Sequence, residues 1–290
     1  MSSSSPVTHT LSSGRRVQRV GLPRRRWQDL YHRYMTLTWP RLFATFAGFF
    51  FAFNLLFAAI YTLQPGDIAH LNPPGFWGRF FFSVETLATV GYGDMHPQTV
   101  FAHIIASIEI FTGMMSLAVI AGMMFARFSR PTARILFARH AVIRPLDGVP
   151  TLMLRAANER HNVILEAQAR LRLARNEQSV EGYRLRRIHD LRLRRAEQPA
   201  FLFGWTLLHP LEPDSPLAGE TLESLQAADA FLILTLSGID ETTGQTLTAH
   251  QEYPPEALRW RHSFVDILSS GADGVDRIDY GKFHDIVPLE

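Results

Sequence analysis

Long apolar segments are concentrated in the first half of this 290-residue chain. The first runs from residue 42 to 63 and is interrupted by three polar side chains, Thr45, Asn54 and Thr62. A helix of this length reaches roughly 33 Å, which is enough to cross the hydrocarbon core of a bilayer. The pattern therefore predicts a membrane-spanning helix over residues 41–63.

Two more apolar segments follow it. Residues 76–88 are too few to cross a bilayer, and prolines and glycines stand on both sides of them, which predicts a re-entrant helix. Residues 100–125 are long enough to span again and carry a single acid, Glu109. We predict a second span over 99–128, so that the transmembrane domain covers residues 40–128.

The segment before the first span divides into two parts. Residues 1–23 are rich in Ser and Arg and lack an apolar stretch, which predicts a disordered tail rather than a signal peptide. In residues 24–39, aromatic side chains recur at helical spacing among arginines. This pattern predicts an amphipathic helix lying along a membrane surface. An ordinary amphipathic helix packed on protein is the alternative.

The second half of the chain has the period of β-strands. Arginine and leucine alternate at residues 170–173 and again at 191–194. Further short apolar runs, separated by Pro, Gly, Asp and Ser clusters, lie at residues 201–208, 231–236 and 264–268. Several short strands of this kind are typical of a β-sandwich. We predict such a domain over residues 140–290, after a linker over 129–139.

Charge is unevenly distributed although the formal net charge is only +2. Arginines precede the first span and follow the second, whereas the connecting segment, 64–99, contains only Arg79. By the positive-inside rule both termini are expected to be cytoplasmic. The chain has no cysteine, which excludes disulfides and Cys-based metal sites.

A pentapeptide at residues 89–93, Thr-Val-Gly-Tyr-Gly, lies between the short apolar segment and the second span. It resembles the selectivity filter of potassium channels, in which rings of backbone carbonyls replace the hydration shell of K⁺. Gly91 and Gly93 permit backbone angles that other residues resist. Irregular backbone at membrane depth is tolerated where it lines a cavity, so four such loops around one axis, a tetramer, are indicated. A chance turn with two glycines is the alternative.

Motifs outside this pentapeptide resemble the bacterial branch of the inward rectifier potassium channel family, from about residue 24 to 285. They are Trp39-Pro40, Phe81 to Thr86, Ala126 to Phe128, Arg130-Pro131, Leu152-Met153, Arg155-Ala156, Asn158, His189 to Leu191 and Glu241 to Thr243. The resemblance implies a membrane α-helical pore domain with two transmembrane helices and a re-entrant pore helix. It also implies an all-β immunoglobulin-like cytoplasmic domain and a homotetramer. The function implied is passive K⁺ conduction in the bacterial inner (plasma) membrane, gated by movement of the inner helix and the cytoplasmic domain.

The same resemblance implies roles for single residues of the pore. The expected K⁺ ligands are the Thr89 hydroxyl and the backbone carbonyls of Thr89, Val90, Gly91 and Tyr92. Gly113 would be the hinge of the inner helix. Leu117, Ala121 and Phe125 recur every four residues and would line the cavity. Phe125 would form a hydrophobic constriction at its cytoplasmic end, with simple packing against a neighbour as the alternative.

Three arginines at the end of the second span, Arg127, Arg130 and Arg134, suit anionic lipid headgroups. The family resemblance favours a phosphoinositide or another anionic lipid as a modulator, and leaves the sign of the effect open. The alternative is that these arginines only set the topology.

The chain also departs from the family pattern. Strongly rectifying relatives have an acid on the cavity face, where this chain has Leu117, so weak rectification is expected. In relatives the pore-helix glutamate pairs with an arginine after the filter, and Glu85 has no such partner here. We expect Glu85 to interact with Asp94 or His96 instead. A histidine there would make conduction sensitive to external pH. Plain solvent exposure of His96 is the alternative.

Other functional classes find little support. We see no metal-spaced cluster, nucleophile elbow or phosphate loop, so no enzyme activity and no cofactor are expected, with K⁺ as the permeant ligand. The arginines at 170–195 alternate with leucine and are interleaved with acids, which favours a solvated sheet face or subunit interface over nucleic-acid binding. A two-span potassium channel with a different ligand-regulated cytoplasmic domain is the alternative function.

Overall fold

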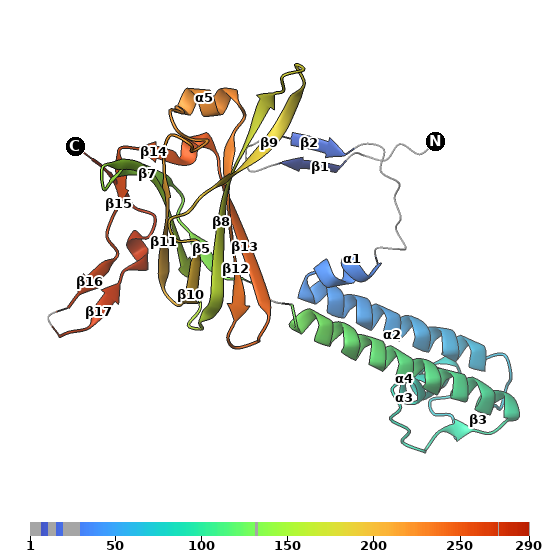
Figure 1. Cartoon of the computed structure of the whole chain (residues 1–290). Coiled ribbons are helices and arrows are strands. Elements are labelled where there is room, and N and C mark those ends of the chain that lie inside the picture. Colours follow the sequence, from blue (N-terminus) through green and yellow to red (C-terminus); the bar gives the residue numbers. More distant parts are fainter. Residues whose placement is uncertain (1–6, 11–15, 20–29, 131–132, 272, 290) are drawn as a thin grey trace. The chain divides into compact units, whose positions relative to one another are not determined.

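The computed structural model describes residues 7–10, 16–19, 30–130, 133–271 and 273–289. The chain divides into two compact units (Figure 1). One is Pro23–Arg130, and the other is formed by Met1–Leu22 with Pro131–Glu290. We describe each unit by itself.

Helices dominate the first unit. They are α1 Leu30–Thr36, α2 Trp39–Tyr61, α3 Phe76–Leu87 and α4 Val100–Phe128. By length and composition, α2 and α4 can cross a membrane. Pro40 lies in the first turn of α2, where its missing N–H costs nothing. At the start of α4 the Thr99 hydroxyl accepts a hydrogen bond from the Ala102 amide at 3.2 Å, which caps the helix.

The short helix α3 packs against both α2 and α4 (Figure 1). Buried apolar side chains from all three helices, among them Phe57, Phe82 and Ala102, form the core of this unit. A two-residue ladder, β3 Ile68–Ala69 with β4 His96–Pro97, ties together the segments that follow α2 and precede α4. The arrangement is the predicted one of two spanning helices and a re-entrant helix.

Element bounds in this unit differ from the predicted ones in one important place. The predicted spans and pore helix, 41–63, 76–88 and 99–128, lie within two residues of α2, α3 and α4. The predicted surface helix does not run to residue 39, because helix α1 ends at Thr36 and Thr38 is extended. A proline in a continuous helix would clash with the carbonyl four residues earlier, so Pro40 requires this break. Residues 24–29 lie outside the described residues.

Part of the predicted disordered tail is ordered, so that prediction is wrong there. Strands β1 Val7–Thr10 and β2 Arg16–Arg19 form an antiparallel pair. The β-branched Val and Thr residues of this segment favour extended backbone, a signal that the Ser and Arg content concealed. The rest of residues 1–23 lies outside the described residues.

Two five-stranded sheets form the second unit (Figure 1). The first contains β8 Ile164–Gln178, β9 Arg184–Leu191, β10 Glu197–Phe201, β12 Phe231–Asp240 and β13 Thr246–Tyr253. The second contains β5 Ile135–Phe137, β6 Ala141–Leu146, β7 Val149–Asn158, β11 Gly204–Pro210 and β14 Leu258–Trp260. All pairings are antiparallel except that of β14 with β6.

Side chains from both sheets meet in one core, which confirms the predicted β-sandwich. On β8, Leu171 and Leu173 are buried, whereas Arg172 between them points outward and pairs with Asp190 at 2.9 Å. The predicted linker, 129–139, contains strand β5, which pairs with β7 and belongs to the sandwich. That part of the prediction is wrong because three consecutive apolar residues are too few to show a period of two.

Smaller elements complete the second unit. They are α5 Leu222–Ala227, η1 Pro255–Ala257, η2 Tyr280–Lys282, β15 His262–Phe264, β16 Leu268–Ser270, β17 Asp276–Ile278 and β18 Ile286–Pro288. Strand β15 pairs with β18, and β16 pairs with β17.

Candidate functional site

The pentapeptide after α3 has an alternating backbone. Thr89, Gly91 and Gly93 have positive φ angles of 56°, 56° and 85°, whereas Val90 and Tyr92 are not among the positive-φ residues. Glycine adopts the left-handed region without strain, whereas threonine does not, so the backbone of Thr89 is strained. In an ordinary extended strand successive carbonyl groups point to opposite sides. Alternation between the two hands flips every second peptide plane relative to that strand, so that successive carbonyl groups can point to one side. This is the geometry that a row of carbonyl ligands needs.

Hydrogen bonds from the amides hold the pentapeptide against the end of α3. The Thr89 amide donates to the Thr86 carbonyl at 3.0 Å. The Val90 and Gly91 amides both donate to the Glu85 carbonyl, at 2.8 and 3.3 Å. Within the described residues, the carbonyls of residues 89–93 accept no backbone hydrogen bond. Their oxygens are therefore free to bind a cation.

Gly113 of α4 lies in direct contact with this end of α3. A Cβ atom at Gly113 would stand 2.0 Å from the backbone oxygen of Leu87, a distance that no real Cβ contact reaches. Helix α4 continues through Gly113 without a break. The first role of this glycine is thus close packing against the pore helix; bending at Gly113 stays a prediction.

Close to this contact, a cluster of buried polar side chains joins α2, α3 and α4. Both carboxylate oxygens of Glu109 accept hydrogen bonds, one from the Tyr61 hydroxyl at 2.8 Å and the other from the Ser83 hydroxyl. The Ser83 oxygen also lies 3.0 Å from the side-chain oxygen of Asn54, whose amide donates to the Phe50 carbonyl at 2.7 Å. A serine hydroxyl carries one hydrogen, so it serves one of its two acceptors at a time.

All four side chains of the cluster, those of Asn54, Tyr61, Ser83 and Glu109, are fully buried in apolar surroundings. Buried polar groups without partners are costly, so the cluster fixes how α2, α3 and α4 meet. The sequence offered one signal for it, a lone acid in a long apolar span, which by default marks a functional position. Spacing alone could not identify its partners on two other helices.

On the inner helix, the predicted cavity residues are exposed in the single chain. Leu117 is 67% exposed and Phe125 74% exposed, and Ala121 between them is also exposed. A groove of 670 Å³ lies between α2 and α4. Leu87, Thr89 and Leu117 are among the residues that line it. Apolar side chains of α2 and α4 line most of this groove, and exposed apolar surfaces are typical of interaction sites.

The residues predicted to support the filter are not brought together as expected. Glu85 makes no hydrogen bond or ion pair with Asp94 or His96 among the described residues, although Asp94 is near enough to act on it electrostatically. The His96 ring instead lies beside that of His70, with centroids 5.7 Å apart. Both histidines are exposed.

Comparison with known proteins decides what this arrangement is. The sequence model "Inward rectifier potassium channel C-terminal domain" matches residues 135–290, and the model "Ion channel" matches residues 45–130. The inward rectifier potassium channel Kirbac3.1 of Paramagnetospirillum magnetotacticum is 40% identical over 93% of this chain and 92% of its own. The chain belongs to the inward rectifier potassium channel family. It is a potassium channel subunit.

More distant relatives include animal channels. The human G protein-activated inward rectifier potassium channel 3 is 30% identical over 89% of this chain and 71% of its own. The human ATP-sensitive inward rectifier potassium channel 10 is 28% identical over 90% of this chain and 73% of its own. The similarity to all three relatives covers both units. The β-rich unit of this channel therefore corresponds to the C-terminal domain of the family.

Two of the three arginines predicted to bind lipid have partners within the channel itself. Arg127 donates to the carbonyls of Tyr34, at 3.2 Å, and of Leu37, and its guanidinium lies 4.4 Å from the Trp39 ring centroid. Arg130 donates to the Met35 carbonyl at 3.4 Å. These carbonyls lie in the last turn of α1 and directly after it, where cations are favourable. Both arginines thus link the inner helix to α1.

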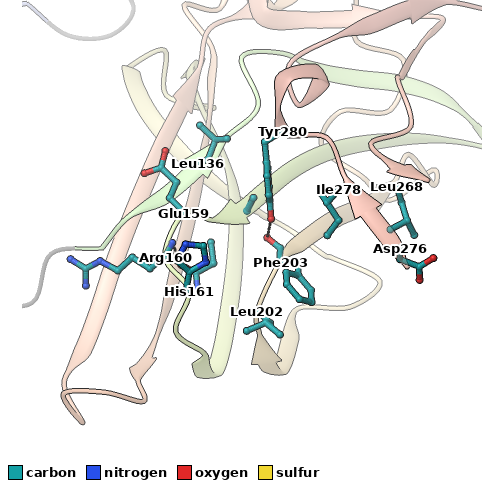
Figure 2. Close-up of a pocket in the computed structure, with 12 residues that line it drawn as sticks. Leu136, Glu159, Arg160, His161, Leu202, Phe203, Leu268, Asp276, Ile278 and Tyr280 are labelled. Carbon is teal, nitrogen blue, oxygen red and sulfur yellow. Dashed lines mark hydrogen bonds between the residues drawn. The ribbon is translucent and has the colours of Figure 1, made fainter. Parts of the chain in front are cut away.

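A second cavity lies in the cytoplasmic unit of the channel (Figure 2). Its volume is 940 Å³, and Arg160 and His161 reach it from one side while Leu268 and Tyr280 reach it from the other. The Tyr280 hydroxyl donates to the Phe203 carbonyl at 3.4 Å. Arg160 is paired with Asp240 at 3.5 Å.

Proposed function

We propose that four copies of this subunit form a homotetramer in which residues 89–93 surround one axis. The carbonyl oxygens of Thr89, Val90, Gly91 and Tyr92, with the Thr89 hydroxyl, then coordinate dehydrated K⁺. Gly93 ends the filter on its outer side. K⁺ is the permeant ligand, and the channel needs no cofactor, has no enzyme activity and binds no nucleic acid.

One observation supports this proposal above the others. Alternating backbone hands at Thr89, Gly91 and Gly93 occur together with amides that are bonded to α3 and carbonyls that are not. Carbonyls freed in this way at membrane depth must line an ion path or be buried in protein, since lipid cannot satisfy them.

Below the filter, the cavity face of α4 controls conduction. Phe125, at the C-terminal end of this face, forms the hydrophobic constriction. Leu117 places no charge in the cavity, so polyamines and Mg²⁺ are held weakly and rectification is weak. Movement of the inner helix and of the cytoplasmic domain opens the constriction, and anionic lipid acts on Arg134 together with Arg127 and Arg130.

The proposed orientation places both termini on the cytoplasmic side of a bacterial inner membrane. Arginines flank the two spans on that side, whereas Arg79 is the only one in the segment 64–99. Arg79 is not free, because it donates to the Tyr61 carbonyl at 3.1 Å and pairs with the buried Asp67 at 3.9 Å.

His96 makes conduction sensitive to external pH in this proposal. Protonation of its imidazole near the outer end of the filter, beside Asp94 and His70, would add positive charge where external K⁺ enters. His96→Gln would therefore reduce the response of K⁺ flux to external pH. An unchanged response would show that His96 is only a solvated side chain.

A liposome flux assay tests the main proposal. Purified protein is reconstituted in neutral and in anionic liposomes, and uptake of K⁺ and of Na⁺ is compared. We expect K⁺ uptake to exceed Na⁺ uptake by at least tenfold in one lipid mixture. Absence of K⁺-selective uptake in every mixture would contradict the proposal.

A further inference from the structure

Two histidines lie next to each other on the outer side of the filter. In the β3–β4 ladder Ala69 is the partner of His96, and His70 is the residue directly after β3. The ladder continues through a hydrogen bond from the Gln98 amide to the Asp67 carbonyl at 2.8 Å. The two imidazoles therefore start from adjacent, paired backbone segments.

The backbone beneath these histidines is anchored. Ile68 of β3 and Met95, which comes directly before β4, are each 6% exposed and belong to the core formed with α2, α3 and α4. His70 itself has a φ of 55°, which is uncommon for a residue other than glycine and directs its side chain away from the regular strand course. Both rings are therefore exposed, while the backbone that carries them is held by the core.

The ring separation fits a shared metal ion. With metal–nitrogen bonds of about 2.0–2.1 Å and tetrahedral angles, two imidazole centroids bound to one ion stand about 5.2 Å apart. The observed separation of His70 and His96 is 5.7 Å, with an angle of 60° between the ring planes. Small rotations of two exposed side chains close the remaining gap of roughly 0.5 Å.

We propose that His70 and His96 form a binding site for divalent transition metals of the Zn²⁺, Ni²⁺ and Cu²⁺ class. Imidazole suits these ions, whereas Mg²⁺ and Ca²⁺ require oxygen ligands. Water completes the coordination, since among the described residues no group of three or more His, Asp or Glu converges on a metal position. The two histidines lie outside residues 89–93, so this site does not share ligands with the proposed K⁺ positions.

The location of the pair gives it a consequence for conduction. His96 is three residues after Gly93, so at most about 11 Å of extended chain separates it from the end of the filter. This is comparable with the screening length of about 8 Å at physiological ionic strength. A bound divalent ion therefore repels K⁺ at the outer entrance and slows its passage.

Acid weakens metal binding at this site, because a metal ligates the neutral imidazole. The other charged groups of the surrounding segments are Asp67, Arg79, Glu85 and Asp94. Asp67 is paired with Arg79, whereas Asp94 is exposed and adds negative charge that attracts a cation. Metal binding and protonation should compete for the same two rings.

Calorimetric titration of the full chain with Ni²⁺ tests the site, and it requires protein purified without a polyhistidine tag. The chain has 12 histidines, so His32→Gln, which removes an exposed histidine from helix α1, is the matched control. We expect one Ni²⁺ per subunit in the wild type and the control, and binding at least tenfold weaker in both His70→Gln and His96→Gln. Loss of about half the affinity in each, or no loss, would overturn the proposal, because independent histidines do not chelate.

A second variant distinguishes loss of the site from misfolding of the protein. Because the chain has no native cysteine, introduced cysteines are the only thiols. The double change His70→Cys and His96→Cys should replace the Ni²⁺ site with one that prefers Cd²⁺ at least tenfold, because thiolates are soft ligands. A folded double variant, eluting as the wild type does, that bound neither metal would contradict the proposed juxtaposition. This binding measurement does not depend on whether the protein conducts K⁺.

Discussion

Gly113 lies against the carbonyl oxygen of Leu87, so closely that no side chain fits between the inner helix and the pore helix. Leu87 ends α3, and the filter begins two residues later. We therefore expect that a change in the position of α4 at this point would disturb the backbone before the proposed filter.

Gly113→Ala should therefore disturb the filter. Its methyl group would meet a backbone atom that cannot move aside, and overpacking of this kind costs about 1–3 kcal/mol. We expect a lower thermal stability of the tetramer and reduced K⁺ over Na⁺ selectivity. Gly122→Ala is the control, because nothing lies within 4 Å of a Cβ there. Equal effects of the two changes would contradict the packing role of Gly113.

The cluster around Glu109 predicts a sharp difference between two substitutions. In Glu109→Gln the amide can accept from Tyr61 and donate to Ser83, which then donates to Asn54, so every buried group keeps a partner. Glu109→Leu leaves the Tyr61 hydroxyl without a partner, at a cost of about 1–3 kcal/mol.

Thermal unfolding of the tetramer and its ion selectivity measure this difference. Ser107→Ala is a control, because this exposed residue bonds only within its own helix, to the His103 carbonyl. Equal stability of the Gln and Leu variants would show that the hydrogen bonds of Glu109 do not hold the three helices together.

Leu117→Asp should convert weak rectification into strong block by cytoplasmic spermine. A carboxylate on the exposed cavity face of α4 would attract the polyamine, whereas leucine does not. We expect the spermine concentration for half block to fall at least tenfold in voltage-clamped bilayers. Leu117→Asn is the matched uncharged control, and an equal effect of Asn and Asp would place this residue outside the cavity.

Arg127 and Arg134 should respond differently to substitution. Arg127→Gln removes hydrogen bonds to the Tyr34 and Leu37 carbonyls, so its effect on flux should be present even in neutral liposomes. Arg134 is exposed, and Arg134→Gln should alter flux only when anionic lipid is present. If both variants changed flux only in anionic liposomes, the bonds of Arg127 would have no role in gating.

Glu177 predicts a pH-dependent contribution to the stability of the cytoplasmic unit. The hydrogen bond that the Glu177 carboxylate accepts from Arg175 at 2.7 Å, with a further one from His189 at 2.6 Å, holds the pKa of this carboxyl below its usual value. A lowered folded-state pKa stabilises the fold above the unfolded pKa of about 4.3, and this contribution is lost as the pH falls through the folded value.

Glu177→Gln should accordingly lower the stability at pH 7 by less than about 1 kcal/mol, since the pair is partly exposed and screened. Denaturant unfolding at several pH values measures this, and the wild-type advantage should vanish in acid. An advantage that persisted unchanged below the folded pKa would mean that the charge of Glu177 contributes nothing.

Periodicity and length sufficed to predict most of the architecture. The apolar runs gave α2, α3 and α4, because a membrane span needs a fixed length, and the alternation of Arg and Leu on β8 gave one sheet of the sandwich. Short elements were not predicted, since β1, β2 and β5 have too few residues to show a period.

The sequence also could not show which side chains of different helices contact each other. A filter could be proposed at residues 89–93 because its residues are contiguous, whereas the cluster of Tyr61, Ser83 and Glu109 joins three helices through packing that no local pattern encodes. For the same reason His96 was expected near Glu85, although strand pairing places it beside His70. The roles of Phe125 and Arg134 stay predictions.

The reversal potential of single channels, with K⁺ on one side of the bilayer and Na⁺ on the other, tests the filter most directly. Each tenfold preference for one ion shifts this potential by about 59 mV. A carbonyl-lined filter at residues 89–93 predicts a shift of at least about 118 mV in favour of K⁺. A reversal potential near zero, with measurable current, would contradict the account.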